Sequence, residues 1–335
     1  MSENSNLKKV QLVSLKQIYK AKKQIKNYVR VTPLEYSPFL SKMAEGSHVY
    51  IKCENLQRTG SFKVRGAFNK LCLLKESNPD IYKIGAVAAS TGNHAMACTE
   101  AMNQLGIPVH VFVPETISPS KHERLIANKA SLTVFGEDCM YAENAARKYS
   151  EEKGIPFISP YNDIDVIAGQ GTIGLEIFEE QPDIENVFVP VGGGGLIAGI
   201  AAYLKQVNPN IKVIGCQPRL SKVMYESIKA STIIFEESQE TLSDATSGGI
   251  EENSVTFDHC NAFVDDWILV EEETIAKAIY FMLSQHQMVI EGAAGVSLGA
   301  FMTNASRFAG QKSVIVACGA NISMTKLKDI INTSI

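Results

Sequence analysis

Short apolar segments alternate with amphipathic helical segments along most of this chain. The candidate strands are short and apolar, and most end in glycine, proline or a small polar residue: 48–54, 84–90, 109–114, 131–136, 186–191, 212–218, 266–270 and 313–319. Helical patterns lie between them, for example at 93–105, 120–129, 141–153, 195–206 and 272–286. This alternation is typical of βαβ units around a mainly parallel sheet, so the sequence predicts an α/β fold.

The size and charge of the chain limit what it can do. Its 335 residues are enough for two domains of about 150 residues each. The 32 basic and 36 acidic residues give a formal net charge of −4, so no overall basic field favours nucleic acid as a partner. The uncharged stretch 187–204 has the length of a membrane helix, but Pro190 and the glycines at 192–195 would break it. We therefore expect neither a nucleic-acid nor a membrane partner.

The cysteines indicate a reducing compartment. All seven are widely scattered and none forms a C-x-x-C pair: Cys53, Cys72, Cys98, Cys139, Cys216, Cys260 and Cys318. Neither a disulfide framework nor a zinc site is therefore expected. The first 17 residues contain no apolar segment before a small-residue cleavage site, which argues against a secretory signal. The sequence thus predicts a cytoplasmic protein.

The strongest local signal is the segment VPVGGGGLIAGIAAYLK at 189–205. Its consecutive glycines follow a predicted strand and precede a predicted helix: Gly192, Gly193, Gly194 and Gly195. Backbone N–H groups can crowd around an anion in such a loop, and the helix dipole favours negative charge there. A purely structural turn is the alternative, although four glycines would cost it considerable backbone entropy. We interpret the segment as a phosphate site.

The identity of the phosphate ligand is narrowed by the surrounding residues. Gly193, Gly195 and Ala198 fit the dinucleotide fingerprint, which keeps a nicotinamide dehydrogenase open as an alternative. However, Gln217 stands about where that fingerprint needs an acidic residue for the ribose. No Lys-Ser/Thr pair follows the glycines, so a Walker P-loop is not expected. A small phosphorylated cofactor fits best.

A second candidate is Lys63, which lies between Phe62 and Val64 in the segment 54–71. A helical face with Phe68 and Leu71 follows it. Most lysines on such a helix are solvated charges, which is the ordinary interpretation. Apolar surroundings would instead disfavour the ammonium form and so prepare the amine for Schiff-base chemistry. The neighbouring Arg65 is expected to face solvent or a carboxylate.

Two further segments lie at predicted strand ends. In AASTGNHAMA (88–97), hydroxyl and N–H groups gather at a helix start, where they would suit a bound carboxylate or serve only as a cap. Asn93 is the predicted N-terminal cap of that helix and Gly106 its C-terminal cap. His94 could be a general base or a structural residue. Cys318, at the end of the last strand, is by itself a small buried hydrophobe. Open α/β sheets bind ligands at such strand ends.

These segments, in their order along the chain, resemble the threonine/serine dehydratase family of fold-type II pyridoxal-phosphate enzymes, a group that also contains serine racemase and the tryptophan synthase β subunit. The resemblance is carried by GSFKVRGA, STGNH, GGGG and CGANIS, and by SPYND (159–163), AGQGTIGLEI (168–177), TLSDATSGGIE (241–251), VDDWILVEEE (264–273) and IEGAAG (290–295). It implies two open twisted-sheet domains of tryptophan synthase β-like architecture, with pyridoxal 5'-phosphate (PLP) in the cleft between them. The motif order suggests a larger PLP-binding domain of residues 1–84 and 161–335, and a smaller inserted domain of residues 85–160.

The resemblance also implies roles for individual residues. Lys63 would bind PLP covalently and remove the substrate's Cα proton. Asn93 would hydrogen-bond the ring hydroxyl, Phe62 would lie against the ring, and Cys318 would face the pyridine nitrogen. Gly192, Gly193, Gly194 and Gly195, with the N–H of Leu196, would hold the phosphate. The substrate carboxylate would be bound by Ser90, Thr91, Gly92, Asn93 and His94.

The activity that the resemblance implies is β-elimination, which converts L-threonine to 2-oxobutanoate and ammonia and L-serine to pyruvate and ammonia. Alternatives are a dehydratase of 3-hydroxyaspartate, phenylserine or a hydroxyectoine-pathway substrate, a serine racemase, and a non-catalytic amino-acid or PLP-binding protein. Gln217, Ser221 and Val223 offer no carboxylate where racemases of this group bind magnesium, so no metal is expected. Thr91 keeps a hydroxyl where racemases use serine, which leaves some racemisation open.

Two expectations concern the whole protein. The sequence stops at Ile335, directly after the residues that the resemblance covers, so we expect no C-terminal regulatory domain and no isoleucine inhibition through one. A homodimer or homotetramer follows from the resemblance alone.

Overall fold

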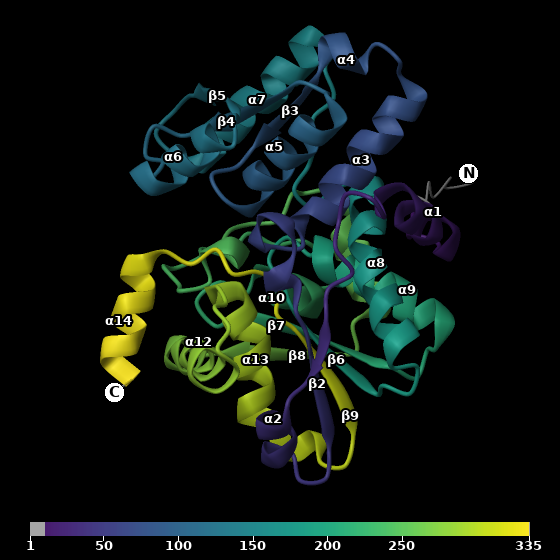
Figure 1. Cartoon of the computed structure of the whole chain (residues 1–335), viewed down its shortest axis with the longest axis vertical. Coiled ribbons are helices and arrows are strands. Elements are labelled where there is room, and N and C mark those ends of the chain that lie inside the picture. The colour runs from purple at the N-terminus through teal and green to yellow at the C-terminus, as the bar shows by residue number, and fades with distance from the viewer. Residues whose placement is uncertain (1–10, 335) are drawn as a thin grey trace, which may run out of the picture.

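The computed structural model describes residues 11–334 and consists of two parallel or mainly parallel sheets with helices packed on them (Figure 1). The predicted α/β class is confirmed. Residues 1–10, which are most of the segment considered for a secretory signal, and the chain end at Ile335 lie outside the described residues.

The larger sheet has six strands in the order β1-β2-β9-β6-β7-β8. All neighbouring strands run parallel except β1, which pairs antiparallel with β2. The strands are β1 (Leu34–Tyr36), β2 (His48–Lys52), β6 (Asn186–Pro190), β7 (Lys212–Pro218), β8 (Asp266–Val270) and β9 (Lys312–Val316). The edge strand β1 was not predicted, because a half-exposed strand of three residues has no apolar run.

The smaller sheet has three parallel strands, β3 (Ala86–Ala89), β4 (Val109–Val113) and β5 (Ser131–Val134). It occupies the upper part of Figure 1 together with α5, α6 and α7, and the larger sheet lies below. Its three strands fall inside 85–160, whereas the strands of the larger sheet come from both sides of that range. The division of the chain into domains at residues 84 and 161 remains a prediction.

The helices that cover the sheets are α1 (Leu15–Ile25), α2 (Pro38–Met43), α3 (Lys63–Ser77), α4 (Ile81–Ile84), α5 (Asn93–Leu105), α6 (Pro119–Ala127), α7 (Cys139–Lys153), α8 (Ile164–Glu180), α9 (Gly195–Val207), α10 (Val223–Ala230), α11 (Val255–Phe263), α12 (Glu272–His286), α13 (Gly292–Asn304) and α14 (Met324–Ser334). Short 3₁₀ turns are η1 (Glu54–Leu56), η2 (Arg58–Gly60), η3 (Asp244–Thr246) and η4 (Ala305–Phe308). In the part of the chain that the structure describes, no helix is long and apolar enough to cross a membrane. The stretch 187–204 is divided between β6, a glycine loop and α9.

Helix α5 shows one correct and one wrong cap prediction. Gly106 closes it in the left-handed conformation (φ 70°, ψ 21°), as expected. Asn93, predicted as the N-terminal cap, is instead the first helical residue, and Gly92 holds the cap position without a side-chain hydrogen bond. The Asn93 side chain does not cap the helix, because it forms hydrogen bonds with Glu291 and Asn321 instead.

A buried network of ion pairs holds helix α3 against the neighbouring helix α8. The Arg65 guanidinium, fully buried, bonds to the Glu54 carboxylate at 2.8 and 2.9 Å and to the Glu176 carboxylate at 2.6 and 2.9 Å. Lys52, also fully buried, pairs with Glu176 at 2.8 Å. Helix α8 packs closely on α3, because a Cβ on Gly169 would lie 2.6 Å from the Arg65 carbonyl oxygen. The carboxylate alternative for Arg65 is therefore the correct one, with two carboxylates rather than one.

Candidate active site

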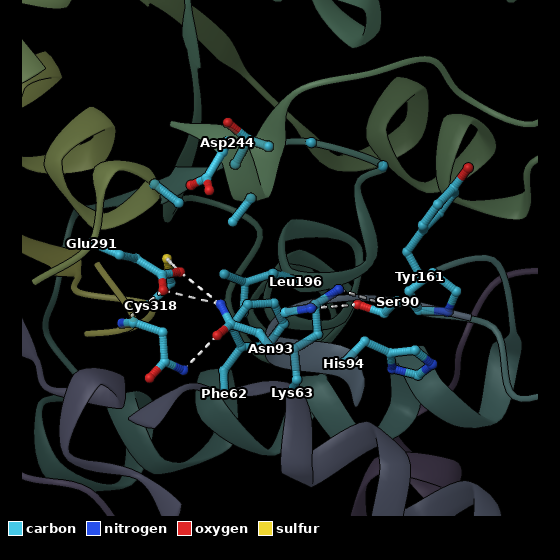
Figure 2. Close-up of a pocket in the computed structure, with 18 of the residues that line it drawn as sticks. Phe62, Lys63, Ser90, Asn93, His94, Tyr161, Leu196, Asp244, Glu291 and Cys318 are labelled. Atoms are coloured by element: carbon cyan, nitrogen blue, oxygen red, sulfur yellow. Dashed lines mark hydrogen bonds between the residues drawn. The ribbon is translucent and has the colours of Figure 1, made fainter. Parts of the chain in front are cut away.

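A cavity of about 320 Å³ opens where the strands of the larger sheet end and helix α5 begins. Every residue predicted for the site lines it: Phe62, Lys63, Ser90, Thr91, Gly92, Asn93, His94, Gly192, Gly193, Gly194, Gly195, Leu196 and Cys318. Figure 2 shows the side chains among them entering this space from separate elements. The structure thus brings the four sequence segments together, although their assigned roles remain predictions.

Lys63 reaches the cavity from the first position of α3. The chain just before it is held against the end of β9, since the Phe62 N–H donates to the Cys318 carbonyl at 3.1 Å and Ser61 forms an antiparallel bridge with Gly319. The Lys63 Nζ donates to the Pro160 carbonyl at 2.8 Å and lies 5.2 Å from the centre of the Phe62 ring. Burial lowers the pKa of the Lys63 ammonium from 10.5 to about 8. The neutral, nucleophilic amine is therefore accessible near physiological pH.

The glycine loop runs from the end of β6 to the start of α9 and leaves no room for side chains. A Cβ on Gly193 would lie 2.5 Å from the Tyr161 ring, and one on Gly192 would lie 2.8 Å from the Thr246 Cα. Gly194 adopts φ 86°, a conformation that favours glycine. The first N–H groups of α9 have no partner inside the helix, and the helix dipole is positive at that end. The loop at the cavity wall therefore has the geometry that suits a bound anion.

The start of α5 supplies a second place for negative charge. Ser90 accepts a hydrogen bond from the Gly92 N–H at 3.1 Å, which orders the turn before the helix. Ser90, Thr91 and Gly92 all line the cavity, so hydroxyl groups and a helix N-terminus face the same space. This arrangement suits a carboxylate.

His94 is buried and is held by a hydrogen bond to the backbone. Its Nε2 lies 2.8 Å from the Ile158 carbonyl oxygen, and only 3% of the residue is exposed. Burial, together with the charge of Lys63, lowers the pKa of the imidazole to about 3. Such a ring stays neutral and is a poor proton acceptor at neutral pH, which favours the structural alternative over a general base.

Sequence reasoning missed Glu291, a buried carboxylate on the cavity wall. It accepts hydrogen bonds from the Asn93 Nδ2 at 2.8 and 3.1 Å and from the Asn321 N–H at 3.0 Å, and the first of these contacts is visible in Figure 2. Burial raises the pKa of Glu291. A signal was present, because Glu291 is the only charged residue between His286 and Arg307. It was used only as part of the motif IEGAAG.

Cys318 faces this carboxylate as well. Its Sγ lies 4.0 Å from Glu291 Oε1, and burial raises the pKa of the thiol well above its usual value, so the thiol stays neutral. Cys318, the residue predicted to face the pyridine nitrogen, therefore lies beside the Glu291 carboxyl group, which the sequence argument did not include.

The region considered for magnesium is occupied by other interactions. Gln217 accepts from the Tyr225 N–H at 2.7 Å and donates to the Val191 carbonyl at 3.2 Å. Among residues 11–334, no three His, Cys, Asp or Glu side chains gather as a metal site would require.

Comparisons with known proteins cover nearly the whole chain. The family model described as pyridoxal-phosphate dependent enzyme matches residues 25–319. An L-threonine ammonia-lyase of Thermotoga maritima is 41% identical over 321 residues, which is 96% of this chain and 79% of that protein. A catabolic L-threonine dehydratase of Escherichia coli K12 is 35% identical over 320 residues, or 95% of this chain and 96% of that protein.

Solved structures also superpose on nearly the whole chain. Threonine deaminase isoform 2 of Solanum lycopersicum superposes with a TM-score of 0.87 at 30% identity, covering 97% of this chain and 95% of that one. Maize serine racemase superposes with a TM-score of 0.88 at 28% identity, covering 97% of this chain and 98% of that one.

Proposed function

The chain belongs to the family of pyridoxal-phosphate dependent enzymes, and from that premise we propose that it is an ammonia-lyase acting on L-threonine and L-serine. The resemblance that the motifs carry is thereby confirmed. The observation that carries the proposal is that a lysine with a lowered pKa and a glycine loop at a helix start line one cavity. The substrate is proposed from relatives at 35–41% identity that are named for threonine.

The cavity fits PLP on two independent features. Lys63 offers an amine for the aldehyde, and the loop Gly192–Gly195 offers backbone N–H groups for the phosphate, with side chains excluded by Tyr161 and Thr246. When bound, PLP withdraws electrons from the amino acid's Cα and so makes its proton acidic.

The residues of the chain perform the remaining tasks. We propose that the Lys63 amine accepts the Cα proton, because its lowered pKa keeps part of it neutral. The start of α5, with Ser90, Thr91 and the following N–H groups, holds the substrate carboxylate. The N–H of Leu196 would add to the phosphate site, the Phe62 ring would lie against the cofactor ring, and the Cys318 thiol would face the pyridine nitrogen; all three residues line the cavity. Asn93 would donate to the ring hydroxyl.

The reaction removes the β-hydroxyl group together with the Cα proton. L-Threonine loses one water molecule in the elimination, and the released enamine takes up one water molecule as it hydrolyses to 2-oxobutanoate and ammonia. L-Serine gives pyruvate and ammonia by the same steps. The site therefore needs a proton acceptor near Cα and groups that hold the substrate carboxylate, and the residues proposed for both tasks line the cavity.

The test is an assay of 2-oxo acid release by the purified, PLP-loaded protein. L-Threonine, L-serine, their D-forms and threo-3-hydroxyaspartate are compared at equal concentration. We expect the highest kcat/KM with L-threonine. A colourless protein that takes up no PLP would contradict the whole proposal, whereas a coloured protein that works best on hydroxyaspartate would contradict only the substrate.

Serine racemase activity is the second candidate, because the Thr91 hydroxyl lines the cavity. The measurement is chiral analysis of L-serine incubated with the protein. Appearance of D-serine faster than pyruvate would favour this alternative.

The Lys63 pKa predicts how fast the apo-protein captures PLP at different pH values. Only the neutral amine attacks the aldehyde, and a pKa lowered to about 8 means that this form prevails above pH 8. The rate of the visible absorbance change on mixing should rise with pH and level off with a midpoint near 8. Nα-acetyl-lysine, measured in parallel, corrects for the titration of PLP itself. A midpoint near 10.5 would show that Lys63 is not desolvated.

The close contact between Gly193 and Tyr161 predicts that a larger residue at position 193 weakens PLP binding. In Gly193→Ala the new Cβ would lie 2.5 Å from the Tyr161 ring, so the loop or the ring must shift. Overpacking of this kind costs about 1–3 kcal/mol, and where that cost falls on the PLP-bound loop, PLP affinity should fall by about 5- to 150-fold. Gly249→Ala is the matched control, because it lines the same cavity and its Cβ would meet nothing within 4 Å. Equal PLP dissociation constants for the two variants would contradict the packing argument.

Two properties of the whole protein complete the proposal. We propose a homodimer or homotetramer, supported by exposed apolar side chains on the edge strand β1 and on α2, namely Tyr36, Phe39 and Met43. Static light scattering measures this directly. We propose a cytoplasmic location, supported by seven cysteines that are all free thiols. Cell fractionation tests it.

A further inference from the structure

A line of hydrogen bonds leads from helix α6 into the cavity. Arg124, in α6, donates from Nη1 to the Asn321 Oδ1 at 2.6 Å. Asn321, which follows β9, donates from Nδ2 to the Asn93 Oδ1 at 2.5 Å and to the Thr59 carbonyl at 2.9 Å. Asn93 in turn donates from Nδ2 to the Glu291 carboxylate, the contact drawn in Figure 2.

The two ends of this line fix its direction. A guanidinium only donates, and both Glu291 oxygens accept N–H bonds here, from the Asn93 side chain and the Asn321 backbone. An asparagine amide, by contrast, can face a neighbour with either its oxygen or its nitrogen. Asn321 therefore turns its oxygen towards Arg124 and its nitrogen towards Asn93. Asn93 must then turn its own oxygen towards Asn321, which leaves its NH₂ group facing Glu291 and the cavity. If either amide rotated by about 180°, its NH₂ group would face a neighbouring donor and its oxygen would face a neighbouring acceptor.

The line also joins the two sheets. Helix α6 packs with the smaller sheet, and Asn321 belongs to the segment that leaves the larger one (Figure 1). Arg124 lines the cavity, and its Nη2 lies 3.4 Å from the same Thr59 carbonyl that Asn321 contacts. Lys121, one turn earlier in α6, makes a longer contact of 3.6 Å with Asp244. Arg124 thus makes the shorter of these two contacts from α6 to the larger sheet's side of the cavity.

We propose that Arg124 is a positioning residue that, through Asn321, keeps the donor side of the Asn93 amide turned into the cavity. The role of Asn93 as the donor to the ring hydroxyl rests on the proposed function. In this role Arg124 acts through Asn321 and not directly on the substrate or the cofactor. Its contribution adds to those of the Thr59 carbonyl and the Glu291 carboxylate, which accept from the Asn321 and Asn93 amides and favour the same orientation.

Three substitutions test the proposal by the PLP dissociation constant of the apo-protein and by the visible spectrum of the bound cofactor. Arg124→Lys keeps a donor-only group, so binding should stay within about threefold of wild type. Arg124→Ala removes the short hydrogen bond to Asn321 and the longer one to the Thr59 carbonyl, and it should weaken PLP binding by about three- to tenfold. Arg124→Glu accepts instead of donating, which favours the turned-over Asn321, so it should weaken binding by more than tenfold and change the spectrum. Glu123→Gln, exposed on the same helix, is the matched control and should behave as wild type.

The outcomes separate this proposal from the proposed function. If the wild-type protein takes up no PLP, the proposed function fails and this inference with it. If the wild type binds PLP but Arg124→Ala and Arg124→Glu match it in affinity and spectrum, only the positioning role is wrong. An equal loss of PLP affinity in Arg124→Lys and Arg124→Glu would also overturn the positioning role, because the shape of the Arg124 side chain, and not its ability to donate, would then be what matters.

Discussion

The variant Lys63→Ala should release 2-oxo acid from L-threonine at a rate about 10⁴-fold or more below that of the wild type. The loss combines two effects, because the same amine is proposed to bind PLP and to accept the Cα proton. Two other cationic side chains line the cavity, Lys121 and Arg124, but both come from α6. Lys63 alone of the three donates to the Pro160 carbonyl and lies beside the Phe62 ring. The measurement is single-turnover and steady-state release of 2-oxobutanoate.

Two control variants show whether the loss in Lys63→Ala is due to the missing amine. Lys63→Arg keeps the positive charge but offers no neutral amine at any accessible pH, so it should be as inactive as the alanine variant. Lys121→Ala should keep activity within about tenfold, because its contact is with the half-exposed Asp244 at 3.6 Å. A small primary amine added to Lys63→Ala should restore part of the rate. An active Lys63→Ala protein with an unchanged visible spectrum would exclude Lys63 from both tasks.

The sequence predicted the fold class and the set of cavity residues well because both follow from local patterns. The strands β7 and β8 and the helices α5 and α12 have the predicted bounds. Strand ends and helix starts carry the candidate residues, and parallel strands bring their ends to one edge. The glycine loop was recognisable because its requirement for small residues is written directly in the sequence.

What the sequence could not supply are partners that lie far away along the chain. Asn93 was predicted as a helix cap because a local pattern shows only the nearby N–H groups, whereas its side chain bonds to Glu291, 198 residues away. The strand β1 exists because it pairs with β2, not because of its own three residues. The burial of Arg65 depends on Glu176, 111 residues further on. Long-range pairing decides these cases, and no periodicity records it.

Arg65→Ala should be the most destabilising substitution of those proposed here. Arg65 and Glu54 are fully buried, so removal of the guanidinium leaves Glu54 with the Thr32 hydroxyl as its remaining side-chain partner. Breaking a buried pair from one side costs about 3–5 kcal/mol, and we expect the Tm to fall by roughly 5–10 °C. Arg307→Ala is the matched control, since its pair with Asp266 is about half exposed and should contribute at most about 1 kcal/mol. Equal Tm values for the two variants would contradict the argument.

The pH dependence of that loss distinguishes a charge effect from a packing effect. Burial opposes ionisation of Glu176, but the charges and hydrogen bonds of Arg65 and Lys52 outweigh it and lower the pKa of Glu176 below its usual 4.5. In the wild type this stabilisation is present above pH 4.5 and is lost as the pH falls through the lowered pKa. Without Arg65, the burial that raises the pKa of Glu176 is opposed by Lys52 alone, so protonation of Glu176 in the folded state relieves the variant as the pH falls. The difference in Tm between wild type and Arg65→Ala should therefore narrow below about pH 5. A difference that stayed constant from pH 8 to pH 4 would mean that lost packing, not uncompensated charge, destabilises the variant.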